Sequence, residues 1–188
     1  MSIVRNIKDF FAQMLLKKEL QKIKRKRMPA GFEQIRTVGI LYIVPEEQEY
    51  PIITDFVRFF QENNKVVKAL GYTNKDYIPH YCFPKLTFDY FTKKNINWLG
   101  KPANKFVTDF IANDFDLMID LNTVENFTLS YIGYMNQARF KVGMMNDRNL
   151  KHYDLMMHVS ENIPLKEYTE QIIHYLTNLN ISSNEQKV

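Results

Sequence analysis

Polar side chains that could bind a ligand directly follow three predicted strands. The strands are residues 37–44, 115–121 and 139–145; each is rich in apolar side chains, and the alternation in the third indicates one exposed face. If these strands run parallel, their carboxyl ends meet at one edge of a sheet, which is where such folds bind ligands. Carboxylate, amide and guanidinium groups at that edge could orient a small polar molecule. The candidate ligand-binding residues are Glu46, Asn122, Thr123, Asn146 and Arg148.

These residues also have a purely structural interpretation. Asn122 and Glu125 have the spacing of a capping box, in which the first side chain accepts from a free amide of a helix and the second reaches back. Residues 146–149, Asn-Asp-Arg-Asn, have the composition of a turn. Both interpretations remain open at this stage, and capping is favoured for Asn122.

Two further patterns could do chemistry. Asp114 and Asp116 form the D-x-D pattern that can hold a divalent cation through carboxylate oxygens, but they precede their strand, at the edge opposite the expected ligand site. His80 and Cys82 would share one face of an extended segment, where an imidazole could activate a thiolate. We favour a buried, unreactive Cys82, because free cysteine usually behaves as a small apolar side chain.

The glycines exclude the familiar phosphate-binding loops. The chain has six glycines, and no two are closer than eight positions, so neither G-x-G-x-x-G nor G-x-x-x-x-G-K-[ST] occurs. We therefore predict no catalytic residues, no metal and no cofactor, and we favour a non-catalytic protein.

Positive charge is concentrated at the start of the chain. Residues 1–27 contain nine basic and two acidic side chains, a net charge of +7, whereas the remaining 161 residues have a net charge of −3. A mildly basic average of +4 therefore describes neither part. The candidate residues for binding an anionic surface are Lys17, Lys18, Lys22, Lys24, Arg25, Lys26 and Arg27.

The same segment is predicted to be a basic amphipathic helix over residues 3–27. Its early apolar side chains recur at spacings of three and four, which places them on one face: Ile3, Val4, Ile7, Phe10, Phe11, Met14 and Leu15. Three hypotheses follow. The apolar stripe docks on the rest of the protein, the helix lies in an anionic membrane surface, or its basic side chains contact nucleic acid or an acidic protein.

The elements that must position these residues indicate an α/β fold. Further strands are predicted over residues 65–72 and 153–159, and the segments between strands have helical periodicity. Alternating strands and helices are typical of a three-layer, mostly parallel sheet of the Rossmann-like or flavodoxin-like type. The predicted helices are 51–63, one opening at Pro102, 123–136 and 164–179.

The predicted organisation has four parts. Residues 1–28 form the basic helix, 29–36 a linker, 37–179 the α/β domain and 180–188 a polar tail. Residues 74–101 are predicted to be irregular, and the aromatic side chains between Tyr77 and Trp98 could cover a sheet edge or stack on nucleic-acid bases. We favour the structural role.

Composition also indicates the compartment. One cysteine excludes an intrachain disulfide, and no apolar run has the roughly 20 residues of a membrane span. The first thirty residues lack the apolar core of a secretory signal. We expect a cytoplasmic protein without a transmembrane segment, with peripheral attachment at the inner face of the membrane as an option.

Two resemblances add to this interpretation. Residues 38–41 (Val-Gly-Ile-Leu), 97–102 (Asn-Trp-Leu-Gly-Lys-Pro) and 115–121, behind a basic helix, resemble a family of uncharacterised bacterial α/β proteins of about this length. That resemblance implies a fold and no activity. Residues 115–145 are also similar to the N-terminal half of heptosyltransferase-like glycosyltransferases. Residues 45–50 lack the Gly-Asp pattern of that family, so this resemblance implies at most a degenerate half.

The sequence thus supports two hypotheses about function. In the first, a non-catalytic α/β protein is attached to an anionic membrane surface or an anionic partner by its basic helix. In the alternative, the chain is a small ligand-binding or enzymatic Rossmann-like module with its site at the carboxyl ends of the strands. Its oligomeric state is open.

Overall fold

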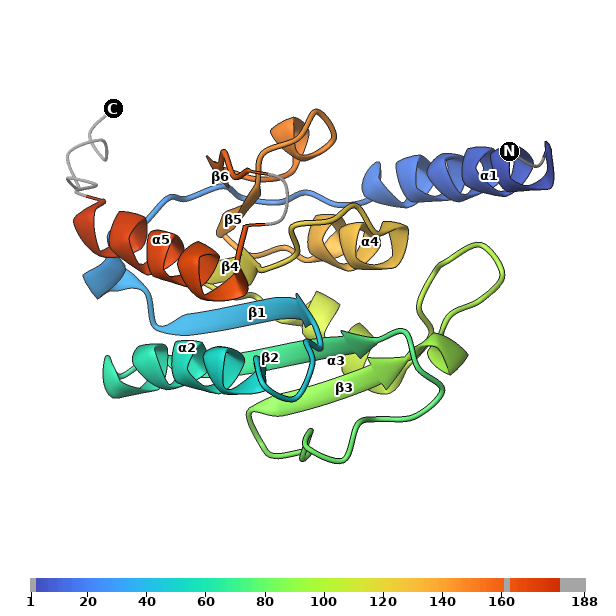
Figure 1. The fold of residues 1–188 in the computed structure, drawn as a ribbon. Coiled ribbons are helices and arrows are strands. Elements are labelled where there is room, and N and C mark those ends of the chain that lie inside the picture. Colours follow the sequence, from blue (N-terminus) through green and yellow to red (C-terminus); the bar gives the residue numbers. More distant parts are fainter. Residues whose placement is uncertain (1–2, 161–162, 180–188) are drawn as a thin grey trace, which may run out of the picture.

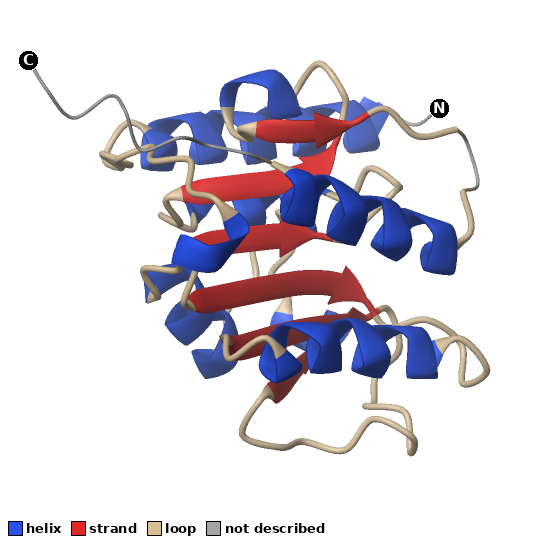
Figure 2. Cartoon of the chain, turned by 90° about the vertical axis from the view of Figure 1, so that its left-hand side faces the viewer, coloured by secondary structure: helices blue, strands red, loops and turns tan. Residues whose placement is uncertain are grey.

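A six-stranded parallel sheet forms the centre of the molecule, with helices on both faces (Figures 1 and 2). The computed structural model describes residues 3–160 and 163–179. The strands are β1 (Thr37–Ile43), β2 (Val66–Thr73), β3 (Phe88–Thr92), β4 (Leu117–Asp120), β5 (Phe140–Met144) and β6 (Leu155–Met157). The helices are α1 (Ile3–Leu20), α2 (Tyr50–Glu62), α3 (Lys105–Ala112), α4 (Phe127–Met135) and α5 (Leu165–Asn178).

The strand order is β3-β2-β1-β4-β5-β6. After β1 the chain adds β2 and β3 on one side of the sheet, and it then adds β4, β5 and β6 on the other side. This is the Rossmann order, and the point where the order reverses lies between β1 and β4. The predicted three-layer α/β fold is confirmed. Of the two types that the sequence left open, the strand order is that of the Rossmann-like type.

Two apolar cores lie on opposite faces of the sheet. Because side chains alternate along a strand, Val38, Ile40 and Tyr42 of β1 point to one core and Leu41 points to the other. The first core is closed by α2 and α5, and the second by α3, α4 and the end of α1. Both faces of the central strands are therefore covered, which explains their nearly continuous apolar sequences.

The prediction that residues 74–101 are irregular is wrong for residues 88–92, which form strand β3. Phe88, Tyr90 and Phe91 are buried, and the strand pairs with β2 at the sheet edge. For these aromatic side chains the structural role holds. Tyr77, Phe83 and Trp98 of the same stretch are exposed.

Strand β5 corrects a second prediction. Its alternation indicated one exposed face, yet Lys141 is only 1% exposed. The Lys141 amino group donates to the carbonyl oxygens of Gly133 (2.8 Å) and Tyr134 (3.3 Å), in the last turn of α4. These carbonyls have no partner within the helix, so the lysine acts as a buried cap.

The helix boundaries differ from the prediction at three places. The helix predicted to open at Pro102 begins at Lys105, with Asn104 as its cap. Helix α4 begins at Phe127, and Asn126 caps it by accepting from the Leu129 amide (3.2 Å), so the predicted capping box at Asn122 and Glu125 is wrong. Helix α1 ends at Leu20, so the prediction of a helix through residue 27 is also wrong. The predicted tail, 180–188, lies outside the described residues.

Candidate functional site

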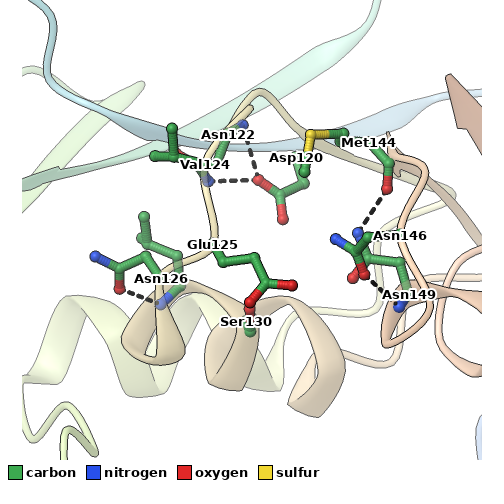
Figure 3. Close-up of a pocket in the computed structure, with 10 residues that line it drawn as sticks. Asp120, Asn122, Val124, Glu125, Asn126, Ser130, Met144, Asn146 and Asn149 are labelled. Carbon is green, nitrogen blue, oxygen red and sulfur yellow. Dashed lines mark hydrogen bonds between the residues drawn. The ribbon is translucent and has the colours of Figure 1, made fainter. Parts of the chain in front are cut away.

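The carboxyl ends of β4 and β5 meet at a small polar cavity (Figure 3). Its volume of about 20 Å³ leaves room for a single water molecule. The lining residues are Asp120, Asn122, Val124, Glu125, Asn126, Leu129, Ser130, Met144, Asn146 and Asn149. The predicted edge of the sheet is thus polar, but it is nearly filled by its own side chains.

Asp120 is the buried carboxylate of this cavity. One oxygen accepts from the Tyr153 hydroxyl (2.5 Å), and the other accepts from the Asn122 amide (3.0 Å) and side chain. Burial raises the pKa of Asp120 to about 6, although these hydrogen bonds favour the charged form. Both carboxylate oxygens are therefore engaged within the protein.

Asn122 forms a hydrogen bond across the point where the strand order reverses. Its side-chain oxygen accepts from the backbone amide of Ile43, at the end of β1 (2.8 Å). Because Asn122 follows β4, this bond bridges the two strands between which a ligand crevice was expected. The side chain has a structural role here that differs from the predicted helix cap.

The remaining predicted ligand residues are only partly brought together. Asn146 lines the cavity and accepts from the Asn149 amide (2.9 Å), which confirms the predicted turn. Arg148 lies 3.2 Å from Glu125 in an exposed ion pair. Glu46 is exposed and Thr123 is half-buried, and neither lines the cavity.

Asp120 and Tyr153, which form the centre of this polar cluster, were not predicted from the sequence. A carboxylate inside the apolar run of residues 115–121 was the available signal, because a buried charge requires partners. The identity of the partner carried no local signal, since Tyr153 is 33 positions away.

The two other patterns do not form reactive sites. Asp116 lies at the amino-terminal edge of the sheet and accepts from the amides of Arg36 and Thr37. Within residues 3–160 and 163–179, no three His, Cys, Asp or Glu side chains are arranged to hold a metal ion. Cys82 is buried while His80 is exposed, so they do not share a face, and burial raises the pKa of the Cys82 thiol to about 11.

The basic run after α1 forms an extended segment that crosses the amino-terminal ends of β5 and β6. This segment, residues 21–31, is here called the strap. Its central residue is Arg25, which donates to the carbonyl oxygens of Ala138 (2.6 Å), His152 (2.9 Å) and Arg139 (3.2 Å). Arg25 also forms an ion pair with Asp154, and the two side chains are only 10% and 7% exposed. Burial, with a contribution from nearby Arg27, lowers the pKa of Arg25 to about 10. Arg25 therefore fastens the strap to the protein.

The lysines of the strap point away from the protein. Lys22, Lys24 and Lys26 are exposed, and Ile23 and Arg25 between them are half-buried, which is the alternation of an extended chain. Arg27 is half-exposed, 3.6 Å from Asp154. Lys17 and Lys18, at the end of α1, are also exposed. Five of the seven predicted basic residues are thus available to an anionic surface.

Helix α1 docks on the protein through one face near its end. Ala12 and Leu16 are buried, and Glu19 accepts from the amino group of Lys101 (2.6 Å) and from the hydroxyl of Tyr131. Burial raises the pKa of Glu19, but these hydrogen bonds and the charge of Lys101 lower it by more. The contact places α1 alongside α4 (Figure 1).

The opposite face of α1 is apolar and uncovered. Ile7, Phe10, Phe11 and Met14 are 51%, 66%, 42% and 53% exposed. At 3.6 residues per turn, this face lies about 180° from the face that holds Ala12 and Leu16. The hypothesis that the early stripe docks on the body is therefore wrong for these four side chains. Ile3 and Val4 lie outside the described side chains.

A larger groove of about 540 Å³ lies between α1, α4 and residues 147–152. Leu16, Leu20 and Phe127 supply apolar walls, and Lys17 and Lys151 supply charge at its border. A groove of this kind can accommodate apolar groups next to an anion, immediately beside the exposed lysines of α1.

Within the described ranges, none of the helices is both long and apolar enough to cross a membrane.

A comparison with protein families matches residues 8–179 to a family described as "Family of unknown function (DUF6913)". No curated protein and no solved structure matches the chain. The resemblance to glycosyltransferases accordingly stays an expectation from the sequence.

Proposed function

We propose, for a chain that belongs to the DUF6913 family of unknown function, a non-catalytic role in which α1 and the strap attach the α/β domain to an anionic membrane surface. Attachment is peripheral: the helix lies in the plane of the headgroups with its apolar face toward the acyl chains.

The observation that carries the proposal is the uncovered apolar face of α1. Ile7, Phe10, Phe11 and Met14 are exposed on one side of a helix that is already fixed to the protein by its other side. Single exposed apolar side chains are common, whereas a contiguous patch indicates a binding surface. Full burial would contribute about 1.5–3 kcal/mol for each of these side chains, so partial burial of four contributes several kcal/mol.

Positive charge adjoins this face. Lys18 follows Ile7, Phe11 and Met14 along one side of the helix, because positions separated by three or four residues align. The strap then presents three further exposed lysines: Lys22, Lys24 and Lys26. Each basic residue near an anionic bilayer contributes about 1 kcal/mol. An apolar face combined with a basic cluster supplies the two signals that stable peripheral attachment needs.

Vesicle flotation of the full chain tests the proposal. We expect flotation with vesicles containing phosphatidylserine and little with neutral phosphatidylcholine vesicles. Phe10→Ser with Phe11→Ser should abolish most flotation, whereas the control Phe83→Ser should not, since Phe83 is as exposed as Phe10 (both 66%) and lies on a different part of the chain. Equal loss in both variants would contradict the role of α1.

The charge contribution has its own variants. Replacing Lys22, Lys24 and Lys26 by Gln removes about 3 kcal/mol at low salt, a weakening of about 100-fold. A control with the same charge change replaces three exposed lysines of the domain: Lys85, Lys105 and Lys166. Tighter binding to RNA than to anionic vesicles would overturn the membrane proposal in favour of a nucleic-acid partner.

Variants that test the proposal must keep Arg25 of the strap. Removing residues 1–27 would also remove Arg25 and leave Asp154 buried without its guanidinium partner. Loss of binding would then be confounded with loss of stability. Substitutions at exposed positions avoid this problem.

The alternative function, a ligand site at the carboxyl ends of the strands, is favoured by one observation: the buried carboxyl of Asp120 beside a polar cavity. The residues proposed for it remain Glu46, Asn122, Thr123, Asn146 and Arg148. Its weakness is the cavity volume of about 20 Å³. A thermal-shift screen of metabolites should give a stabilising compound whose effect is lost in Asn146→Ala. A screen without such a compound would count against this alternative.

A further inference from the structure

The groove between α1, α4 and residues 147–152 has an apolar interior of the size of a small-molecule site. Its volume of about 540 Å³ lies within the range of about 300–1,000 Å³ that is usual for such sites. The apolar walls come from α1 and α4: Leu16, Leu20, Phe127 and Tyr134. Along α1 the groove extends from Gln13 to Leu20, which is about 10 Å at 1.5 Å per residue. An alkyl chain of that length would lie along the helix.

Positive charge borders this interior on two sides. Lys17 lines the groove from the helix, and Arg148 and Lys151 line it from the opposite loop. Asp147 is the one acidic residue among those that line it, so the lining has a net charge of 3 − 1 = +2. Arg148 is already paired with Glu125. Within residues 3–160 and 163–179, neither Lys17 nor Lys151 forms an ion pair. An anion in the groove would therefore meet two lysines that have no acidic partner.

The titration of His152 supports a positive potential in the groove. Its ring lines the groove and stacks on Tyr134, with the ring centroids 4.0 Å apart. Burial, followed by the charges of Lys141 and three other basic side chains, lowers the pKa of His152 to about 4. The surroundings that disfavour an imidazolium cation here favour a bound anion.

The loop that carries the basic side chains is held in place by its neighbours. Asn149, within the loop, accepts from the Tyr134 hydroxyl (2.7 Å) and donates to the carbonyl oxygen of Met144 (2.6 Å). The strap adds a hydrogen bond from Arg27 to the carbonyl oxygen of Lys151. A loop fixed in this way loses little conformational freedom when a ligand binds, which favours affinity.

We propose that this groove binds a phosphate monoester with an alkyl chain, with the phosphate at Lys17 and Lys151 and the chain along Leu16 and Leu20. The monoester carries about −1.5 to −2 charges at pH 7, which complements the lining better than the single charge of a carboxylate. A chain that lies in the groove does not lie in a bilayer at the same time, so the ligand binds as a single molecule from solution.

This site goes beyond the proposed membrane attachment and uses another side of α1. At 3.6 residues per turn, Gln13 and Lys17 lie between the docked face, which holds Leu16, and the uncovered apolar face. Ligand binding and vesicle flotation are therefore separate measurements, and absence of flotation would leave the groove site intact.

Isothermal titration calorimetry of the full-length protein with octyl phosphate, below its micelle concentration, tests the proposal. We expect one saturable site per chain. Octanol and inorganic phosphate each supply one part of the ligand, so each should bind at least tenfold more weakly. Equal affinity for octanol would overturn the role of the lysines, and equal affinity for inorganic phosphate would overturn the role of the apolar walls.

Variants at exposed lysines locate the phosphate. Lys17→Gln with Lys151→Gln should weaken octyl phosphate binding by about tenfold, because both cations at the phosphate are lost. The matched control is Lys105→Gln with Lys166→Gln, which removes two exposed lysines of α3 and α5 and should leave the affinity unchanged. Equal weakening in both pairs would show a non-specific charge effect and would refute the inference.

A variant of the wall locates the alkyl chain. Leu20→Ala should weaken octyl phosphate binding by about tenfold, since Leu20 is half-buried and lines the groove, whereas the exposed control Leu86→Ala should have no effect. Circular dichroism confirms that each variant remains folded. Adsorption on the uncovered face of α1 would exceed one ligand per chain and would be insensitive to Leu20→Ala, and either result would overturn the groove site.

Discussion

Replacing Lys141 by Met should remove a specific pH dependence of stability. The amino group is buried between β5 and α4, and burial, followed by the charges of Arg25 and Arg27, lowers its pKa from 10.5 to about 6. Between these two values the unfolded chain binds a proton that the folded protein does not. Unfolding therefore takes up a proton, and raising the pH through this range stabilises the folded state.

The magnitude follows from the size of the shift. Each pH unit in this range changes the free energy of unfolding by about 1.4 kcal/mol, so stability should rise by about 2 kcal/mol from pH 7 to about 8.5. Other groups contribute little in this window. His152, whose pKa is lowered to about 4, acts below 6.5, and Cys82, whose pKa is raised to about 11, acts above 9.

Urea unfolding followed by circular dichroism measures the effect at several pH values in this window. Lys141→Met should lose the slope. Its stability at pH 7 reflects two opposing changes, because the cost of deprotonating a lysine disappears while the carbonyl oxygens of Gly133 and Tyr134 lose their donor. Lys105→Met is the same substitution at an exposed position and serves as the control. An unchanged slope in Lys141→Met, or no slope in the parent, would refute the argument.

Three further predictions concern the strap, the polar cluster and Cys82. Arg25→Ala should reduce the free energy of unfolding by about 3–5 kcal/mol, because Asp154 stays buried without its partner; a double variant that also carries Asp154→Asn should recover part of the loss in urea unfolding. Gly133→Ala would place a methyl group against the Tyr153 hydroxyl, so a loss of about 1–3 kcal/mol is expected in the same assay, and a neutral effect would show that Tyr153 can move. The Cys82 thiol should react with a disulfide reagent only slowly until denaturant is added; rapid labelling of the native protein would contradict its burial.

The basic segment divides into two roles that its composition did not separate. The Arg25 side chain is largely buried and paired with Asp154, whereas the lysines on either side of it remain exposed. The acidic domain is therefore one partner of the basic segment, through Asp154. The contact of Lys101 with Glu19 has the opposite sense, since it joins a basic side chain of the domain to an acidic one of α1. What remains free is the surface that the proposed membrane attachment uses.

The α/β class follows from local sequence patterns, because the periodicity of neighbouring residues distinguishes strands from helices. It also placed Asn146 in a turn and Cys82 in the core, since both depend on local composition. The short strand β3 was not predicted, because a short element at the sheet edge owes its stability to packing partners. The predicted boundaries of α1 and α4 were also wrong, because the contacts of Arg25 and the cap at Asn126 form only in the folded chain.

Contacts between distant residues depend on the folded arrangement of the chain. Asp120 pairs with Tyr153, Arg25 reaches residues more than a hundred positions away, and Asn122 bridges to β1. The same structure decided which face of α1 is buried, because both faces are apolar in sequence. Contacts of this kind arise from the order of the strands, and no pattern of neighbouring residues encodes that order.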